Sequence, residues 1–431
     1  MKTSIVWFKT DLRLHDNETL VRAIEQSDQI IPVYCFDDND FITTDFGFKK
    51  TGSFRTKFLL ESLIDLDKRL REMGSGLLIA KGKPEIELIK LVQKFNVQKV
   101  FSKKEVAYEE IRTQDLVEKE LWKVHCTLET FSTSTLYHAQ DLPFALKDIP
   151  DVFTNFRKQI EKEVSIRSVF QKPNTISSPK IDSLVLPSLA QLGLPHFDKD
   201  CRAAIDFKGG ETEGLNRLKT YFFETQAISN YKVTRNGMIG ENYSTKFSPW
   251  LALGCLSPRE IYVELKKYES IYQANDSTYW LQFELLWRDY FRFMMKKYKH
   301  HYFLEFGINE AKIESAKHNS LLFDKWKSGE TGIEFIDANM NELNSTGFMS
   351  NRGRQNVASY FCNQLQLDWR YGAAYFEQQL IDYDVCSNWG NWAYLAGVGN
   401  DPRGKREFNI EKQANDYDKL KTYRKLWLTK M

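Results

Sequence analysis

Polar and aromatic side chains alternate between Gly347 and Arg403, in the stretch of the chain best suited to chemistry. The polar members are amides, guanidinium groups and carboxylates, namely Asn351, Arg352, Arg354, Gln355, Asp382, Asp384 and Asn388. The aromatic members are Trp369, Trp389, Trp392 and Tyr394. Burying such a mixture is costly unless the polar groups line a cavity or bind a ligand. The stretch therefore predicts a ligand site.

Two spacings within this stretch suggest what the site could hold. Asp382 and Asp384 are two residues apart, so in an extended segment both carboxylates would face one side and accept N–H groups or ribose hydroxyls. Arg354 is a candidate counter-ion. The alternative is a surface turn with solvated acids, because most aspartates are exposed. Asn388 and Trp392 are four residues apart, so in a helix an amide and an indole would share a face.

The motifs SNRGRQ, DYD, CSNWGNW and AGVGNDPR resemble the flavin site of the photolyase and cryptochrome family, and most closely that of its DASH-type cryptochromes. The resemblance implies FAD in a folded conformation. It implies that Asn388 lies beside flavin N5 and tunes its redox state, that Asp382 and Arg354 lie near the ring, and that Asp384 lies near the ring and ribityl edge.

A second group of cofactor residues lies upstream of this stretch. Ser248 with Pro249, and Ser257 with Pro258 and Glu260, have the signatures of helix N-caps, the second as a full capping box. Exposed N–H groups at helix starts favour phosphate, although a cap without any ligand is equally compatible with the pattern. The resemblance implies contacts with the flavin, chiefly its pyrophosphate, from Tyr231, Thr245, Lys246, Phe247, Ser248 and Arg288.

The segment from Trp280 to Lys297 predicts a helix with an acid inside an aromatic stripe. Trp280, Glu284, Trp287 and Phe291 share one helical face. An i,i+4 pair between Glu284 and Arg288 would explain the acid without any function. The resemblance instead implies that Glu284 meets the carbonyl and N3 edge of a flipped thymine pair while Trp287 stacks on it. Asn351, Gln355 and Tyr394 would complete this lesion pocket.

Electron transfer to the flavin is the third role that the resemblance implies. Family members typically use three tryptophans, and Trp392 and Trp369 match the first two. The third would lie near Ala316, but residues 308–322 contain no tryptophan. We therefore expect the solvent end of the path to be absent or rerouted through a tyrosine such as Tyr371 or Tyr375. Ordinary core packing is the alternative for any single tryptophan.

Residues 1–135 alternate strand and helix patterns. Short apolar runs predict strands at 4–8, 30–36, 77–80, 97–101 and 127–131, and helices are expected at 17–26, 53–73, 84–95 and 108–124. This order predicts a five-stranded, parallel, doubly wound α/β domain. No GxGxxG follows the first strand, which argues against a standard dinucleotide site. The resemblance implies an antenna, commonly a folate such as methenyltetrahydrofolate, near Glu109, although a solvated helix start explains that acid equally well.

The rest of the chain divides into a connector and a helical domain. Six of the eleven prolines fall at 143, 150, 173, 179, 187 and 195, so we expect residues 136–207 to form an irregular inter-domain connector. Residues 208–431 show helical periodicity, which predicts an all-α domain, and the resemblance implies that this domain binds FAD.

Composition limits the class of protein. No apolar run approaches 18 residues, and the first residues are too short an apolar stretch for a secretory signal, so we expect neither a membrane span nor secretion. Six cysteines lie scattered without a CxxC pair, which favours reduced thiols in the cytoplasm and no metal site. The net charge is only +2, so DNA binding must use a local basic patch. We expect a monomer.

The resemblance implies a blue-light-dependent flavoprotein that splits cyclobutane pyrimidine dimers by electron transfer from photoexcited reduced FAD. Gln355 and Tyr394 replace a methionine and a tryptophan that dimer photolyases often carry, so the pocket is more polar and we expect a preference for single-stranded or locally opened DNA. The alternative is a blue-light photoreceptor that binds DNA or a protein partner without efficient repair. Repair of the other major photoproduct is disfavoured because no histidine lies in the expected pocket.

Overall fold

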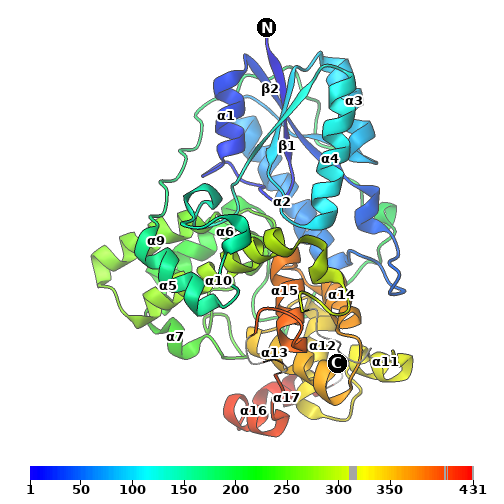
Figure 1. The fold of residues 1–431 in the computed structure, drawn as a ribbon, viewed down its shortest axis with the longest axis vertical. Helices are drawn as coiled ribbons and strands as arrows, with labels where there is room; N and C mark the ends of the chain where they lie inside the picture. Colours follow the sequence, from blue (N-terminus) through cyan, green and yellow to red (C-terminus); the bar gives the residue numbers. More distant parts are fainter. Residues whose placement is uncertain (310–317, 402–403, 405, 430–431) are drawn as a thin grey trace.

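A computed structural model describes residues 1–309, 318–401, 404 and 406–429 (Figure 1). The N-terminal part contains one sheet of five strands: β1 Thr3–Phe8, β2 Gln29–Phe36, β3 Leu78–Lys81, β4 Lys99–Lys103 and β5 Thr127–Phe131. The strand order is β3-β2-β1-β4-β5, and every neighbouring pair is parallel. The predicted parallel sheet is confirmed, with β4 starting two residues later than its apolar run.

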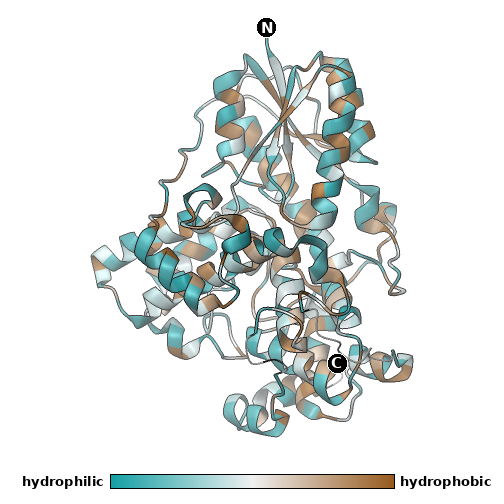
Figure 2. Ribbon diagram, viewed as in Figure 1, coloured by the Kyte–Doolittle hydropathy of each residue, from teal (hydrophilic) through white to brown (hydrophobic). Residues whose placement is uncertain are grey.

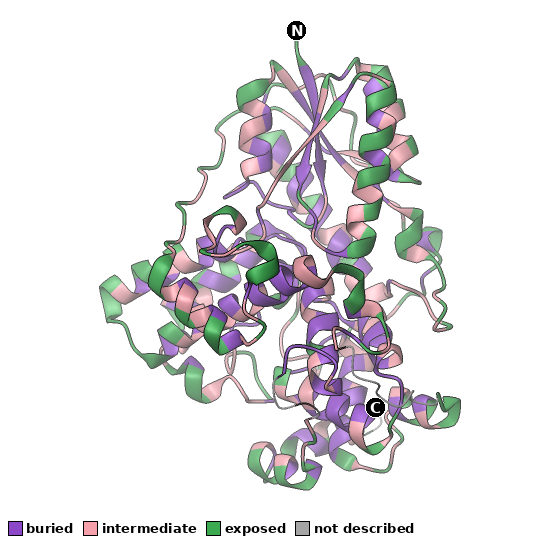
Figure 3. Cartoon of the chain, viewed as in Figure 1, coloured by how far each residue is buried: buried purple, intermediate pink, exposed green. Residues whose placement is uncertain are grey.

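Helices cover both faces of this sheet, because the strands are apolar on both sides. The helices are α1 Glu18–Gln26, α2 Ser53–Glu72, α3 Pro84–Phe95 and α4 Tyr108–Lys123. Along β1, Val6 and Phe8 share a core with residues of α1 and α2, whereas Ile5 and Trp7 share a second core with residues of α3 and α4. The sheet is therefore doubly wound, and its central strands β1, β2 and β4 are mainly buried (Figure 3).

The predicted connector contains one regular element that the sequence interpretation missed. Helix α5 spans Phe153–Glu163 and packs against α10, which spans Asp276–Tyr298. No proline lies between Pro150 and Pro173, and Phe153, Phe156 and Ile160 form a buried face at helical spacing. The expectation of an irregular connector is therefore wrong for this segment.

The regular elements of the described chain after residue 208 are all helical. Besides α10 they are α6 Glu211–Lys219, α7 Tyr231–Thr234, α8 Ser248–Ala252, α9 Pro258–Tyr272, α11 Ser320–Ser328, α12 Glu334–Thr346, α13 Asn351–Ser359, α14 Trp369–Gln379, α15 Val385–Ala396, α16 Ile410–Tyr417 and α17 Thr422–Leu428. Figure 2 shows hydrophilic and hydrophobic residues on the same helices, as expected for helices that bury one face. No helix in the described residues is long and apolar enough to cross a membrane.

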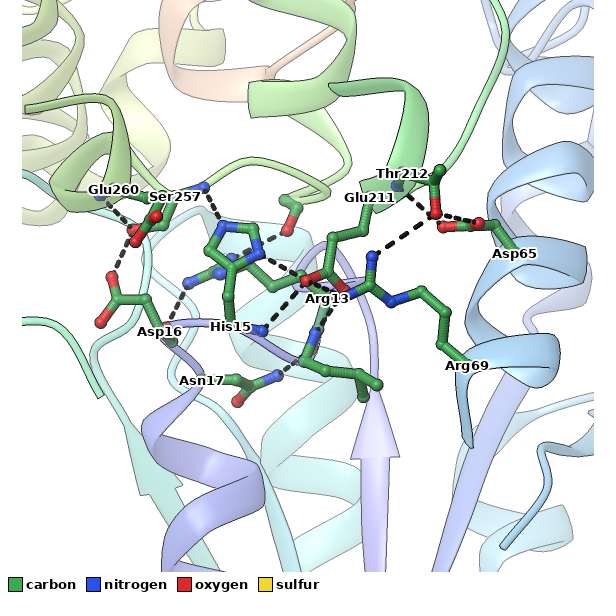
Figure 4. Close-up of polar contacts among 12 residues, drawn as sticks. Arg13, His15, Asp16, Asn17, Asp65, Arg69, Glu211, Thr212, Ser257 and Glu260 are labelled. Atoms are coloured by element: carbon green, nitrogen blue, oxygen red, sulfur yellow. Dashed lines mark hydrogen bonds and ion pairs between the residues drawn. The ribbon is translucent and has the colours of Figure 1, made fainter. Parts of the chain in front are cut away.

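A buried polar cluster joins the sheet to the helical half (Figure 4). Glu211, at the start of α6, is 1% exposed and accepts hydrogen bonds from His15 Nδ1 at 2.6 Å and Arg69 Nη2 at 2.8 Å. His15 Nε2 accepts the backbone N–H of Ser257, the N-cap of α9. These partners fix one tautomer of His15, with the proton on Nδ1. The loop after β1 is therefore tied to both α6 and α9.

Candidate functional site

Helix α15 lies at the centre of the candidate site and packs against α10, α13 and α14. Two glycines permit this close packing. A Cβ on Gly390 of α15 would overlap the Phe291 ring of α10, and a Cβ on Gly372 of α14 would overlap the indole of Trp392. The predicted chemistry-bearing residues of these helices are thereby brought to one region, and Asn388 and Trp392 lie on one helix as expected.

Asp384 begins α15 and is held by cations from α10. Its Oδ1 caps the helix by accepting the Ser387 N–H at 2.9 Å, and its Oδ2 lies 3.1 Å from Arg292 and 3.9 Å from Arg288. Burial alone would raise the pKa of this carboxyl, but the two guanidinium groups and the capping N–H outweigh burial and lower the pKa to about 2. Asp384 is therefore a largely buried carboxylate that is ionised at neutral pH.

Asp382 has a separate partner. Its Oδ2 lies 2.8 Å from Arg354 of α13, as the sequence predicted, and its side chain is 1% exposed. Asp382 and Asp384 do not share a counter-ion, because Arg354 of α13 binds Asp382 whereas Arg292 and Arg288 of α10 lie beside Asp384. That the two acids together accept groups of one ligand stays a prediction. The alternative of a solvated surface turn is wrong, because the Asp382 side chain is only 1% exposed and the Asp384 side chain only 10% exposed.

Several buried polar atoms near these acids have no hydrogen-bond partner among the described residues. They are Lys246 Nζ, Arg352 Nε, Gln355 Oε1 and Asp382 Oδ1. The Lys246 ammonium lies 3.1 Å from the centre of the Tyr243 ring, and burial holds its pKa well below the ordinary value. Leaving such groups unpaired is costly, so they indicate a ligand with both donors and acceptors and with negative charge near Lys246.

The segment around Lys246 differs from the predicted helix start. Thr245, Lys246 and Phe247 are buried, whereas Ser248 is exposed and is the first residue of the five-residue helix α8. Phe247 occupies the N-cap position, so the prediction of a Ser248 cap is wrong. Ser257 does cap α9, accepting the N–H groups of two following residues. The structure has a complete capping box at α10, between Asn275 and Thr278.

Two residues assigned to the cofactor make contacts within the protein. Tyr231 is buried at the start of α7. The Asn388 amide is buried and donates to the Ala373 carbonyl of α14 at 2.9 Å, which fixes its orientation.

Glu284 is the anomalous acid of α10, and the structure gives it a partner distant in sequence. Its Oε1 lies 2.7 Å from Arg235, which follows α7, and accepts the Trp280 indole N–H at 3.1 Å. Burial raises the pKa of Glu284, and Arg235 opposes that rise. The suggested pair with Arg288 is not formed; Arg288 donates instead to the carbonyls of Ser134 and Leu251.

Trp287 lies one turn from Glu284 and packs against aromatic rings from other elements. Its ring stacks on Phe153 of α5, with centroids 3.6 Å apart and an interplanar angle of 12°. Tyr394 of α15 meets it edge-on at 6.2 Å. The Tyr394 hydroxyl accepts from Arg406 at 2.8 Å, and that guanidinium also lies over the Tyr394 ring. Glu284, Trp287 and Tyr394 thus form one half-buried cluster.

Helix α13 supplies the other predicted pocket residues. Asn351 is exposed at its first position and Gln355 is half-buried one turn later. Between them, Arg352 donates to Asn236 at 3.1 Å. Asn236 follows Arg235, the partner of Glu284, so the start of α13 is linked to the segment that holds this acid.

Glu109 lies apart from all these residues. It is in the first turn of α4, its side chain is 66% exposed, and its Oε2 lies 2.6 Å from Lys50 Nζ. The next acid, Glu110, has a buried Oε2 without a hydrogen-bond partner among the described residues, and burial raises its pKa to about 7.

The tryptophans assigned to electron transfer are buried. Trp392 and Trp369 are 2% and 4% exposed, so neither contacts solvent extensively. The Trp369 indole N–H donates to the Glu305 carbonyl at 2.9 Å. The position near Ala316, where the third tryptophan was sought, lies outside the described residues.

Sequence interpretation missed four residues of this region, namely Phe153, Arg235, Arg292 and Arg406. The sequence pattern could have identified Arg292, because this residue lies four positions after Arg288 on the same helical face. The other three approach through tertiary contacts, and no local pattern pairs them with their partners.

Comparison with known proteins agrees with this arrangement. The DNA photolyase domain matches residues 4–177, and the FAD binding domain of DNA photolyase matches residues 280–431. Cryptochrome DASH of Synechocystis sp. is 48% identical over all of this chain and 88% of its own length, and Cryptochrome DASH of Danio rerio is 48% identical over all of this chain and 84% of its length.

Solved structures agree as well. The crystal structure of Synechocystis sp. PCC6803 cryptochrome superposes with a TM-score of 0.95 at 48% identity, covering 99% of this chain and 89% of that one. An archaeal photolyase from Sulfolobus tokodaii, described with two FAD molecules, has a TM-score of 0.78 at 28% identity, covering 99% and 90%. The chain therefore belongs to the DNA photolyase and cryptochrome family, and within it to the DASH-type cryptochromes.

Proposed function

We propose that this protein binds FAD in its helical half and uses blue light to split cyclobutane pyrimidine dimers in single-stranded or locally opened DNA. Residues 1–135 would form the antenna domain, 136–207 the connector and 208–431 the FAD-binding and catalytic domain. We further expect a monomer that works in the cytoplasm.

The unpaired buried groups support FAD as the ligand. Lys246, with Thr245, Phe247 and Ser248 beside it, would neutralise the pyrophosphate, whose charge suits an ammonium that has no hydrogen-bond partner among the described residues. Asp384, fixed by Arg292, and Asp382, fixed by Arg354, would accept N–H or hydroxyl groups of the ring and ribityl chain. Asn388 would lie beside N5, with Tyr231 and Arg288 completing the site.

When bound, reduced FAD supplies a photoexcited electron that splits the cyclobutane ring and is afterwards returned. The protein positions the dimer and excludes water. The observation that carries this proposal is Glu284, a half-buried carboxylate fixed by Arg235 and the Trp280 indole next to Trp287. A fixed carboxylate in that place can accept a thymine N3–H, and Trp287, backed by Phe153 but still partly exposed, can stack on a base.

The remaining pocket residues support a preference for opened DNA. Gln355 and the Tyr394 phenol bonded to Arg406 present polar groups where a larger apolar surface would grip a dimer more firmly. Flipping a base pair out of a duplex costs a few kcal/mol. A pocket that binds the dimer weakly offsets less of this free energy, so a dimer that is already unpaired is the better substrate.

We propose a folate antenna near Glu109. The support is local: Lys50 and Glu109 form an ion pair, and the buried Glu110 Oε2 beside them has no hydrogen-bond partner among the described residues. A pterin carries N–H donors that could satisfy these carboxylates. Adding methenyltetrahydrofolate to the purified protein should produce a shifted absorption band, and Glu109→Gln should weaken uptake. Equal uptake by this variant would exclude the role of Glu109.

The central test is a repair assay with chemically reduced, FAD-loaded protein under blue light. Oligonucleotides carrying one thymine dimer, single-stranded and duplex, should be repaired, the single-stranded one faster. Glu284→Ala should lower repair while retaining bound FAD, and Glu118→Ala on the exposed face of α4 is the matched control. Unrepaired dimers in both substrates would favour the photoreceptor alternative, and full activity of Glu284→Ala would remove the role given to this acid.

A further inference from the structure

The chain has no tryptophan between residues 308 and 322, so the electron path beyond Trp369 needs another exit to solvent. The structure provides a continuation from its own residues. The Trp369 ring packs edge-on against Trp389 of α15, with centroids 5.7 Å apart and an interplanar angle of 77°. Trp389 is 5% exposed, so it is an interior residue with a defined orientation.

The first step of the path, from Trp392 to Trp369, is set by helix α14. The Trp392 indole lies directly against Gly372, where a Cβ would overlap it. Trp369 lies three residues before Gly372, one turn earlier on the same helix. Trp392 therefore lies against α14 one turn from Trp369, and Trp369 in turn packs on Trp389 of α15.

Trp389 leads to a phenol and a carboxylate. Its indole N–H lies 3.2 Å from both Tyr383 OH and Glu377 Oε2. Glu377 is 7% exposed, and burial raises its pKa, while Lys50, Arg55 and a hydrogen bond from Tyr383 oppose that rise. A buried carboxylate beside a phenol is a suitable proton acceptor.

Tyr383 also lies closer to solvent than the tryptophans. It is half-buried, whereas all three indoles are buried. The guanidinium of Arg55 lies 4.5 Å from the centre of its ring.

We propose that Trp389 and Tyr383 carry the electron path of this protein from Trp369 to solvent, with Glu377 as the proton acceptor. The inference rests on FAD binding as proposed above. With oxidised FAD bound and photoexcited, Trp392 would give up one electron, and electrons from Trp369, Trp389 and Tyr383 would fill the vacancies in turn. As Tyr383 loses its electron, its phenolic proton passes to the Glu377 carboxylate. A soluble thiolate then gives one electron to the neutral tyrosyl radical and becomes a thiyl radical, while the proton returns from Glu377 to the phenol.

A second possible electron-transfer route runs from Trp392 through Trp326 of α11 to Tyr375, but Tyr375 lacks a good proton acceptor. The Trp326 ring lies 6.1 Å from Trp392, and Tyr375 lies 5.9 Å from Trp326. Tyr375 is 6% exposed, and its hydroxyl donates to the Asn344 amide oxygen at 2.6 Å. A neutral amide is a much weaker base than a carboxylate, so oxidation of Tyr375 lacks a proton acceptor of the kind that Glu377 offers to Tyr383.

The test compares variants of the two routes in FAD-loaded protein. After a blue-light flash of the oxidised protein, freeze-trapped electron paramagnetic resonance should show a tyrosyl radical that changes shape with ring-deuterated tyrosine. Tyr383→Phe and Trp389→Phe should abolish this signal, and Glu377→Gln should replace it with a short-lived tryptophan radical. The matched controls Tyr375→Phe and Trp326→Phe should retain the tyrosyl signal.

A second readout needs no flavin. In the ultraviolet resonance Raman difference between wild type and Tyr383→Phe, the Tyr383 phenol should appear as a hydrogen-bond donor, and this signature should be lost in Glu377→Gln. A retained signature would overturn the role of Glu377. A tyrosyl signal that survives Tyr383→Phe, or one lost only in the Tyr375 variant, would overturn the proposed path.

Failure here is distinguishable from failure of the repair proposal. Chemically reduced protein does not need the path, so Tyr383→Phe should repair dimers at the wild-type rate after chemical reduction. Unrepaired dimers together with a normal Tyr383 radical would refute only the repair proposal. Normal repair without a Tyr383 radical would refute only the proposed electron path through Trp389 and Tyr383. A protein that takes up no FAD would refute both.

Discussion

Replacing Asp384 with asparagine should remove a defined electrostatic stabilisation of the helical half. Asparagine is also a good N-cap, so Asp384→Asn retains the acceptor for the Ser387 N–H and deletes only the charge that faces Arg292 and Arg288. The pKa of this carboxyl is lowered from 3.8 to about 2. A shift of about 1.8 units corresponds to about 2 kcal/mol of stability at pH 7.

The sign of the pH dependence follows from the depressed pKa. The stabilisation is fully present above the unfolded value of 3.8 and disappears as the pH falls through the folded value of about 2. In urea unfolding of the apoprotein, followed by tryptophan fluorescence, Asp384→Asn should be about 2 kcal/mol less stable than wild type at pH 7, and about half that at pH 3.

The exposed Asp324, paired with Lys327 on α11, provides the control. Its side chain is 62% exposed, so Asp324→Asn should change the unfolding free energy by less than about 0.5 kcal/mol at either pH. If Asp384→Asn behaved like this control at pH 7, or if its deficit were the same at pH 3, the carboxylate would not be stabilising the fold through its charge.

Three further substitutions test the packing around the site. Arg354→Met leaves Asp382 as a buried unpaired charge and should lower the unfolding free energy by about 3–5 kcal/mol, with partial recovery on adding Asp382→Asn, as measured in urea. Gly390→Ala places a methyl group against the Phe291 ring and should cost about 1–3 kcal/mol, visible as a lower Tm. Glu211→Gln should destabilise the protein at pH 7, with a difference that shrinks below pH 4.5, because the folded pKa of this acid is depressed despite its burial; a constant difference would contradict this.

The sheet was predictable because its determinants are local. Each strand is a short apolar run, each helix between strands carries a recognisable start such as Asn17 or Pro84, and the alternation of the two admits few topologies. The connector helix α5 was missed because proline density was read over the whole segment. The gap between Pro150 and Pro173 is long enough for three helical turns.

The partners of the site residues were far harder to predict from the sequence. Asp382 and Asp384 look equivalent in sequence, yet the turn into α15 directs one toward Arg354 and the other toward Arg292. Spacing indicates that two carboxylates lie near one another, but tertiary packing decides which cation meets each. Tertiary packing also decides the partner of Glu284. This acid pairs with Arg235, 49 positions away, and not with the neighbouring Arg288.

This division of partners has a consequence for the flavin site. Arg354 and Arg292 belong to different helices, and α15 packs against both of those helices. Asp382 therefore links the turn before α15 to α13, and Asp384 links the start of α15 to α10. Because both carboxylates are largely buried, losing the arginine partner of either one should destabilise the protein. A ligand that hydrogen-bonds to both acids would be held by groups whose positions are already fixed before binding, so little ordering entropy remains to be lost on association.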